Sequence, residues 1–430
     1  KSLFEVPNKK KLTLKKREPV EDADSPSFVS QNYAVCLVNI RGLGVKTFSY
    51  AIPPEMRNAI KIGQALLVPF GRQGLINAFC VGFSDYLPPE IRAKRISKIL
   101  DETPLFSVEY LKLLEWVANY YCVDLITVLN AAIPLKLIEK SLKIEQIIEF
   151  VKVDGATKRQ LEILEKLKEF GKMPLIEFEK KVKTTRATVK KLVDLGCVKL
   201  TDEQVYRNPL EILHIDKKED LFELSTTQQK VYEGISNQIK HEKAPQILLH
   251  GITASGKTEV YFKLIDDTIK AGKNVLFLAP EIALASQLTK RLARKFGTRD
   301  VAIWHSSISE GERYDVWQKL YKNEIKILAG ARSAVFAPIK NLGLIIIDEE
   351  HEGAYKQSSP APRYDARLVA RKLAEFNSCP LILGSATPDI SSYYRAVNSN
   401  HLFEMLKRYN NAKVAPVSVI NMQEYGRAAY

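Results

Sequence analysis

The apolar positions between Tyr33 and Asp101 form short runs that are separated by glycine and proline. The runs are YAVCLVNI, KTFSYAI, QALLVPFG and LINAFCVGFS. Such runs, rich in β-branched and aromatic residues, predict strands, and the intervening glycines and prolines predict turns. Four or more strands in so short a segment favour a small β-barrel or sandwich. We therefore expect a β-rich domain over residues 31–104.

Between residues 105 and 215 the apolar residues recur at steps of three and four, which is the helical period. The first such segment is SVEYLKLLEWVANYYCVDLITVLNAAIP, and it stops at Pro134. Later, TTRATVKKLVDLGCVKLTDEQVYR predicts a helix from about Thr185, a stop at Gly196 and a short pair of strands. This order is typical of a winged helix-turn-helix, in which that helix would face DNA. A three-helix packing module without a ligand fits almost as well.

From about Leu221 onward, apolar strand-length runs alternate with helical stretches. The runs are QILLHG, NVLFLAP, VAIWH, IKILAG, LGLIIIDEE and PLILGSATP. Strands that are apolar on both faces belong to parallel sheets wrapped by helices. The chain is therefore predicted to be a multidomain α/β protein, in which a winged-helix domain over residues 105–215 precedes a parallel-sheet domain over residues 216–430.

Composition and charge narrow the functional classes. The 430 residues contain 64 Lys and Arg against 50 Asp and Glu, a net charge of +14 that favours polyanionic partners. Residues 1–30 carry basic clusters followed by EPVEDADSPS, which predicts a flexible, solvated tail. The five cysteines include no Cys-x-x-Cys pair, so neither a disulfide framework nor a zinc site is predicted. No apolar run reaches membrane-span length and no secretory signal is evident, so we expect a cytoplasmic protein without a membrane partner.

The segment GITASGKT, from Gly251 to Thr258, has the spacing G-x-x-x-x-G-K-S/T. It follows the strand QILLH and precedes a predicted helix, so its backbone N–H groups can converge on a phosphate at the helix N-terminus. Lys257 is predicted to contact the β- and γ-phosphate oxygens of ATP, and Thr258 to bind Mg²⁺ through its hydroxyl. The residues predicted to bind the nucleotide here are Gly251, Thr253, Ser255, Gly256, Lys257, Thr258 and Glu259.

A second motif, LGLIIIDEEHEG, ends a buried strand in consecutive carboxylates. Carboxylates at such a position are costly unless a cation or catalysis uses them. We expect Asp348 to belong to the Mg²⁺ shell and Glu349 to deprotonate the attacking water. Without Lys257, a solvated acidic cap would be the simpler interpretation.

The third motif, LILGSATPDI, places the hydroxyls of Ser385 and Thr387 at a strand tip, where they can link the nucleotide to a second ligand. In this order the three motifs are the signature of a superfamily-two helicase. They belong to the first of its two RecA-like lobes.

Longer segments resemble the bacterial primosomal protein N′ (PriA) family of replication-restart helicases. They include VLFLAPEIALASQL, WHSSISEGER, ILAGARSAVFAPIKNLGLIIIDEEHEGAYKQ and PRYDARLVARKLA, with FSYAIPPEM, LLVPFGR and ANYYCVDLITVLNAAIP upstream. The resemblance runs from about Tyr33 to the C-terminus. It implies a first domain that holds the nascent 3′ end at a stalled fork, a winged-helix domain and a 3′→5′ ATP-driven motor. Its implied partners are forked and single-stranded DNA, primosome proteins and single-strand-binding protein.

The resemblance also implies a pocket for the 3′ terminus, formed by Phe48, Ser49, Gly71 and Lys94. Phe48 could stack on the last base, although core packing explains it about as well, and Lys94 could contact phosphate. The family usually has aspartate at position 49. Serine can still hydrogen-bond there but lacks the charge with which aspartate would accept from a free 3′-OH.

In the motor, the resemblance implies that Gln228 lies near the adenine and that His351 couples the Mg²⁺ site to the DNA path. It implies strand-tracking loops, with Arg332 as a phosphate contact and further residues Pro280, Glu281 and Ser333. It also implies an aromatic-rich loop that senses single-stranded DNA, with Tyr355, Arg363 and Tyr364. Three positions depart from the family pattern: Ala254 replaces glycine, and Ala285 and Ala331 replace threonine.

The chain lacks a second-lobe motif with an arginine finger and paired zinc-binding cysteines, which belong to the family's C-terminal half. We therefore expect a fragment that binds ATP weakly and hydrolyses it poorly, with zinc only in the missing half. A non-catalytic fork-DNA and nucleotide-binding module and another superfamily-two DNA translocase remain alternatives.

Overall fold

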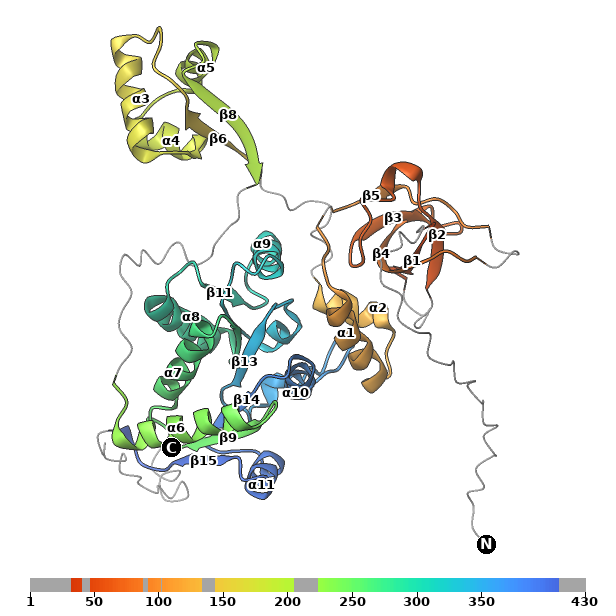
Figure 1. Cartoon of the computed structure of the whole chain (residues 1–430), viewed down its shortest axis with the longest axis vertical. Helices are drawn as coiled ribbons and strands as arrows, with labels where there is room; N and C mark the ends of the chain where they lie inside the picture. The colour runs from red at the N-terminus through yellow and green to blue at the C-terminus, as the bar shows by residue number, and fades with distance from the viewer. Residues whose placement is uncertain are drawn as a thin grey trace, which may run out of the picture.

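The computed structural model describes residues 32–40, 47–87, 92–101, 103–133, 144–204 and 223–409. The predicted tail over residues 1–30 lies outside the described residues. No described helix has the length and apolarity that crossing a membrane requires. Figure 1 shows a small β-rich body, a separate helical body with its own sheet, and a larger body built on a parallel sheet.

The β-rich body is a five-stranded antiparallel sheet that closes on itself. Its strands lie in the order β2-β1-β4-β3-β5. Their bounds are β1 (Tyr33–Val38), β2 (Phe48–Ala51), β3 (Ala65–Pro69), β4 (Leu75–Ser84) and β5 (Lys98–Ile99), with the 3-10 helix η1 (Pro54–Met56) after β2. The Ala51 N–H donates to the Lys94 carbonyl at 2.9 Å, and the Ile96 N–H donates to the Ala51 carbonyl at 3.1 Å. These bonds join the two edges, so the predicted small β-barrel is confirmed.

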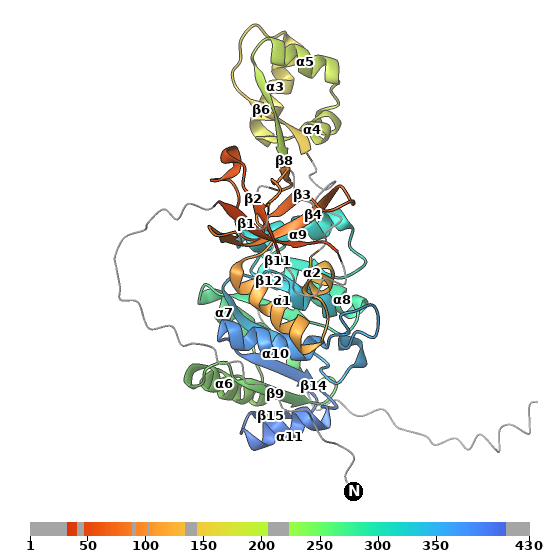
Figure 2. The same ribbon diagram turned by 90° about the vertical axis from the view of Figure 1, so that its right-hand side faces the viewer.

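Two helices follow the barrel, α1 (Val108–Tyr120) and α2 (Leu125–Ala132). Their apolar faces share one core with the barrel and the parallel-sheet body, in which Phe79, Val117 and Trp317 are buried. The Trp317 indole N–H donates to the Leu105 carbonyl at 2.8 Å. Both views show α1 beside α10 (Ala366–Asn377) (Figure 2).

This arrangement differs from the expected winged-helix domain over residues 105–215. The helical period shows that α1 and α2 bury one face, but it does not show which body covers that face. In the structure the barrel and the parallel-sheet body cover it.

The separate body over residues 144–204 has its own core, which includes Ile148, Phe178 and Leu192. It contains β6 (Ile144–Phe150), α3 (Lys158–Phe170), β7 (Met173–Pro174), α4 (Leu175–Val182), α5 (Arg186–Asp194) and β8 (Val198–Gln204). The predicted helix begins where expected, because the Thr185 side chain accepts from the Thr188 N–H. The predicted strand pair after Gly196 differs: β8 pairs antiparallel with β6, upstream of α3. The sequence pattern of a strand does not show which other strand it pairs with.

The large body is built on a seven-stranded parallel sheet, as the apolar runs predict. The strands lie in the order β11-β12-β10-β13-β14-β9-β15. They are β9 (Gln246–Gly251), β10 (Asn274–Leu278), β11 (Val301–Trp304), β12 (Ile327–Gly330), β13 (Leu342–Ile347), β14 (Leu381–Ser385) and β15 (Leu402–Met405). Alternate residues of β13 enter different cores: Ile345 joins one cluster and Ile346 the other. Both faces are therefore buried.

Helices cover each face of this sheet. Buried residues of α6 (Thr226–His241), α7 (Lys257–Lys270) and α8 (Ile282–Phe296) belong to one core. Buried residues of α9 (Glu310–Tyr321), α10 and α11 (Ile390–Asn398) belong to the other. Two 3-10 helices, η4 (Arg332–Phe336) and η5 (Gly353–Tyr355), follow strands β12 and β13. The carboxyl ends of the parallel strands bring the motif loops to one edge.

Candidate nucleotide site and DNA cleft

The loop from β9 to α7 requires glycine at both predicted positions. A Cβ on Gly251 would lie 2.7 Å from the Ser255 Oγ, and a Cβ on Gly256 would lie 2.1 Å from the Gln228 Nε2. Gly256 also has φ +85°, in the left-handed region that favours glycine. Ala254, where the family has glycine, adopts φ +64°, so the substitution leaves a strained residue in the loop.

Lys257 is buried at the start of α7, and its ammonium faces the inside of this loop. The Nζ donates to the Gly251 carbonyl at 2.6 Å and lies 3.9 Å from a Glu349 carboxylate oxygen. The Ser255 Oγ is buried without a hydrogen-bond partner among the described residues. An ammonium, an unpaired hydroxyl and a helix N-terminus therefore converge on one small space, which suits a phosphate.

The two predicted carboxylates lie just after β13. The Asp348 N–H donates to the Leu278 carbonyl, and the Tyr261 hydroxyl donates to the Asp348 carboxylate at 3.1 Å. Burial raises the pKa of Asp348, the neighbouring Glu349 charge raises it further, and Lys257 opposes both. The sheet thus brings Lys257, Asp348 and Glu349 together although they are far apart in the sequence.

The remaining predicted nucleotide residues divide into two groups. Thr253 is exposed in the loop and Thr258 is half-buried in the first turn of α7. The Glu259 carboxylate instead accepts from Arg291 of α8 at 2.8 Å, so α8 engages this side chain. Glu259 follows the motif directly in the sequence, but this proximity does not place its side chain in the nucleotide site.

Gln228 is buried beside the loop, and both ends of its amide are bonded within the protein. Its oxygen accepts from the Ser225 N–H at 2.8 Å, and its Nε2 donates to the Gly256 carbonyl at 3.3 Å. It lines a pocket of about 160 Å³ together with Ser255 and Tyr409. The structure thus places Gln228 against the phosphate loop, at the edge of a space next to it.

Side chains link the second and third motifs directly. The His351 Nδ1 lies 2.7 Å from the Ser385 Oγ, which also accepts from the Thr387 N–H at 3.0 Å. Thr387 joins this network through its backbone.

Sequence reasoning gave no role to Glu350, whose side chain is 1% exposed. Its carboxylate accepts from the Asp389 N–H at 2.8 Å and from the Ser392 hydroxyl at 3.1 Å. It therefore anchors the acidic turn to the N-terminus of α11. A run of three carboxylates does not show which one is buried.

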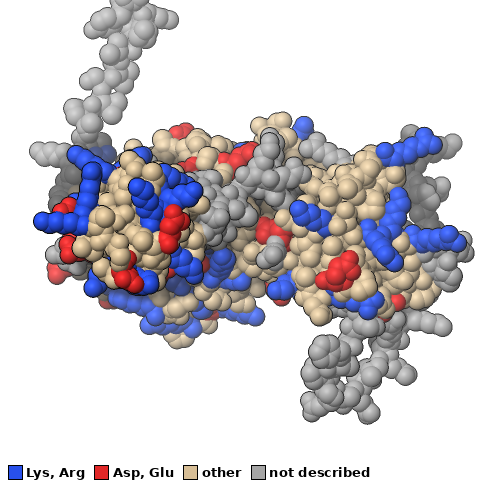
Figure 3. All heavy atoms as spheres, turned by 90° about the horizontal axis from the view of Figure 1, so that it is seen from above, with Lys and Arg blue, Asp and Glu red and all other residues tan. Residues whose placement is uncertain are grey.

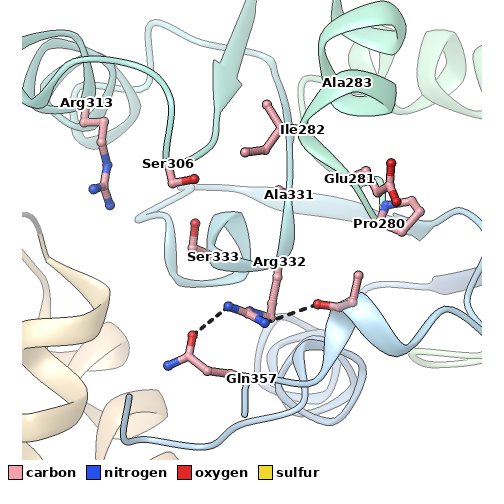
Figure 4. Close-up of a pocket in the computed structure, with 11 residues that line it drawn as sticks. Pro280, Glu281, Ile282, Ala283, Ser306, Arg313, Ala331, Arg332, Ser333 and Gln357 are labelled. Atoms are coloured by element: carbon pink, nitrogen blue, oxygen red, sulfur yellow. Dashed lines mark hydrogen bonds between the residues drawn. The ribbon is translucent and has the colours of Figure 1, made fainter. Parts of the chain in front are cut away.

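A cleft of about 580 Å³ opens beyond the ends of β10, β11 and β12 (Figure 4). The four predicted strand-tracking residues, Pro280, Glu281, Arg332 and Ser333, all line it. Ser306 and Arg313 line it too, and sequence reasoning missed both. They lie in the segment WHSSISEGER, to which the motif reading assigned no role.

The Arg332 guanidinium is bonded to the loop that follows β13. It donates to the carbonyls of Ala354 at 3.3 Å and Lys356 at 3.2 Å, and to the Gln357 side chain at 2.9 Å. These bonds differ from the expected phosphate contact, because they direct the guanidinium towards protein acceptors.

Two predicted DNA-sensing tyrosines are buried, with Tyr355 0% and Tyr364 2% exposed. The Tyr355 hydroxyl donates to the carbonyls of Leu278, at 3.1 Å, and of Asp348. The Tyr364 ring packs on Phe336 with centroids 4.7 Å apart. Neither ring can stack on a base in this conformation, which corrects the expectation of direct contact. Arg363 is exposed.

The predicted 3′-end pocket lies around β2. The half-buried Phe48 ring packs edge-on against Phe70, 5.1 Å away, and Gly71 follows with φ +52°. Ser49 pairs with Val35 across the sheet. Lys94 is exposed beside the far end of β2, to which its carbonyl is bonded. The barrel therefore gathers all four residues within the length of one short strand.

Two family models match the chain. The model of the PriA 3'DNA-binding domain (3'BD) matches residues 37–134, which include α1 and α2 as well as most of the barrel. The model described as type III restriction enzyme, res subunit, matches residues 221–390.

Among solved structures, RecG bound to a three-way DNA junction is similar over 48% of this chain and 27% of its own, at 23% identity and a TM-score of 0.38. The DUF1998 helicase MrfA bound to DNA and AMPPNP is similar over 48% of this chain and 29% of its own, at 21% identity and a TM-score of 0.32. Scores of this size say nothing about function.

Curated relatives align with most of the chain. Replication restart protein PriA of Bacillus subtilis (strain 168) is 33% identical, over 91% of this chain and 58% of the relative. The protein of the same name from Synechocystis sp. is 32% identical, over 87% and 55%. The chain thus spans somewhat more than half the length of these relatives. Aligned with them over about nine-tenths of its length, and with the 3′DNA-binding domain model in its first part, the chain belongs to the PriA family of replication restart proteins.

Proposed function

We propose that the parallel-sheet body is the ATP-binding lobe of a DNA helicase that acts in replication-fork restart. One observation carries the proposal: the Lys257 ammonium lies 3.9 Å from the Glu349 carboxylate, at the mouth of a glycine-bounded loop. That geometry gathers the cation, the helix N-terminus and the acid that phosphoanhydride hydrolysis needs. The helicase activity, its 3′→5′ direction and the fork substrate come from family membership.

The residues present fit Mg·ATP. The unpaired, buried Ser255 hydroxyl and the Lys257 ammonium would hold phosphate oxygens, and the Thr258 hydroxyl and Asp348 would hold the magnesium ion. No group of three or more His, Cys, Asp and Glu in the described ranges is arranged to hold a metal. Magnesium would therefore depend on the nucleotide for most of its ligands. When bound, it neutralises charge on the phosphates.

Glu349 is the residue that would orient water and accept its proton at the carboxylate. Its backbone is left-handed, with φ +46°, and its carboxylate lies 3.9 Å from the Lys257 ammonium. Tyr261 holds the adjacent Asp348 by its hydrogen bond. Glu349 lies beside Lys257 whereas Asp348 is held by Tyr261, so Glu349 would act on water and Asp348 on the magnesium ion.

For DNA we propose two further contact regions. The barrel would bind the nascent 3′ end at Phe48, Ser49, Gly71 and Lys94. The helix α5 would face the duplex, because its Arg186, Lys190 and Lys191 are exposed. Lys and Arg side chains are spread over the face of the molecule seen in Figure 3. Primosome proteins and single-strand-binding protein are proposed as partners, and the cytoplasm, where the chromosome lies, is the proposed location.

The nucleotide site is tested by titrating a fluorescent ATP analogue with Mg²⁺ into the chain and its Lys257→Ala variant. We expect the variant to bind at least about tenfold more weakly, since a charge-assisted contact to phosphate is lost. Lys270→Ala, which removes an exposed lysine at the other end of α7, is the matched control and should leave binding unchanged. Equal affinities for all three proteins would reject the site.

Two alternatives have their own tests. DNA-stimulated phosphate release by the longest gene product separates a helicase from a non-catalytic module, which would release none. Fluorescence anisotropy separates a restart helicase from another superfamily-two translocase. A restart protein should prefer forks with a nascent 3′-OH to forks with a 3′-phosphate.

A further inference from the structure

The cleft beyond β10, β11 and β12 is lined by two arginines, Arg313 and Arg332 (Figure 4). Arg332 makes three hydrogen bonds to residues 354–357. Its guanidinium therefore holds a protein loop in place. Arg313 comes from α9 on the opposite wall, and its side chain points into the cleft in Figure 4.

The Arg313 guanidinium has no hydrogen-bond or carboxylate partner among the described residues. Its buried Nε is unsatisfied, and its charged end lies 5.0 Å from the centre of the Trp304 ring. Burial lowers the pKa of Arg313, and the charge of Glu310 opposes this only in part. Glu281 also lines this cleft, but it forms no ion pair with Arg313. A half-buried guanidinium without a paired anion is costly, so a ligand with negative charge would stabilise it.

The platform under Arg313 is fixed. Trp304 is 1% exposed, packs against Trp317 at 5.8 Å, and its carbonyl accepts from the Ala331 N–H at 3.0 Å. Trp304 thus joins β11 to the turn that carries Ser333. The hydroxyls of Ser306 and Ser333 line the same cleft and add neutral donors beside the cation.

We propose that Arg313, with Ser306 and Ser333, binds a backbone phosphate of single-stranded DNA in this cleft, whereas Arg332 acts on the loop. The inference rests on the proposed function and deepens it, because it names the residue that contacts the strand. A stacked, planar guanidinium suits a phosphate better than a mobile ammonium does. The nucleotide phosphates would lie elsewhere, since the loop after β9 is separated from β10 by β13 and β14.

The test is the salt dependence of oligo(dT) binding by the full chain, followed by fluorescence anisotropy. Each phosphate contact on single-stranded DNA adds about 0.7 to the slope of log affinity against log salt. Arg313→Gln should therefore flatten the slope by about 0.7 and weaken binding about tenfold at low salt. Arg332→Gln should leave the slope within error of the wild type and lower the melting temperature instead.

Arg313→Lys keeps the charge but loses the planar fork, so it should retain the slope and lose several-fold in affinity. A folded Arg313→Gln protein with the wild-type slope would overturn the assignment, as would loss of slope in Arg332→Gln alone. If Arg313→Gln fails to fold, wild-type affinity in Arg313→Lys overturns it. Mg·ATP binding is measured in parallel: Arg313→Gln should retain it. Failure of the nucleotide site would instead appear as wild-type nucleotide binding in Lys257→Ala.

Discussion

Gly384 in β14 lies where the buried Tyr261 hydroxyl crosses the strand, so Gly384→Ala should destabilise the parallel-sheet body. A Cβ at this position would lie 1.6 Å from the Tyr261 hydroxyl oxygen and 3.1 Å from the Asp348 carboxylate. The tyrosine cannot withdraw easily, because its ring is 0% exposed and packs edge-on against Phe277 at 5.6 Å. The methyl group must therefore displace the ring or the strand.

The cost has two parts. Overpacking a buried site costs roughly 1–3 kcal/mol. Loss of the Tyr261 hydrogen bond to a buried carboxylate costs about 1.5–3 kcal/mol more. Together they give about 3–6 kcal/mol, a large share of the roughly 5–15 kcal/mol that stabilises an ordinary domain. At about 2–4 °C per kcal/mol for a body of this size, the melting temperature should fall by roughly 6–24 °C.

The assay is calorimetry or urea unfolding of four proteins: wild type, Gly384→Ala, Tyr261→Phe and the double variant. Tyr261→Phe removes the atom nearest the new methyl group, so the double variant should cost at least about 1 kcal/mol less than the sum of the single changes. Gly353→Ala is the control, because a Cβ there meets nothing within 4 Å. The steric reasoning is wrong if Gly384→Ala has the same melting temperature as Gly353→Ala. It is also wrong if the destabilisation of the double variant equals the sum for Gly384→Ala and Tyr261→Phe.

Three further changes have defined outcomes. Burial lowers the pKa of His305 below its usual 6.5, so on acidification the unfolded chain takes up a proton before the folded protein does. The free energy of unfolding should therefore decrease as the pH drops below about 6.5. His305→Asn can still accept from the Ser307 N–H, and it should flatten the dependence of the melting temperature on pH. Glu350→Ala should cost about 2–4 kcal/mol in urea unfolding, because two donors lose their acceptor, and Glu350→Gln less than half of that. Ser49→Asp, which restores the family residue, should raise the preference for 3′-OH over 3′-phosphate forks in anisotropy; an unchanged ratio would remove Ser49 from end recognition.

The nucleotide loop was predictable because its chemistry is local. Gly251, Gly256 and Lys257 must stand at fixed spacing after a strand, and the structure shows why through the atoms that a Cβ would strike. The carboxylates after β13 were predictable for a related reason, because parallel strands end at one edge of a sheet. In both cases the local sequence marks the end of a strand, and the parallel sheet then brings these strand ends to one edge.

The less predictable features depend on contacts between segments that are far apart. Tyr355 and Tyr364 read as exposed loop aromatics, yet the loop folds back so that Tyr355 bonds to the end of β10. The sequence pointed to Arg332 and gave Arg313 no role, and only the acceptors around each guanidinium separate the two arginines. The partner of β8 likewise lies on the other side of three helices in the chain. Spacing along the sequence carries no information about such pairings.

The core that joins the barrel, α1 and the parallel sheet has a thermodynamic consequence. This core contains Phe79 of the barrel, Val117 of α1 and Trp317 of α9, and all three side chains become exposed if the barrel or the parallel-sheet body unfolds. The barrel, α1 and the parallel-sheet body should therefore melt as one cooperative unit. Residues 144–204 have a core of their own and should melt independently. A cut near residue 215 that leaves the motor lobe alone would bare the surface that α1 covers, which makes insolubility the expected fate of that product.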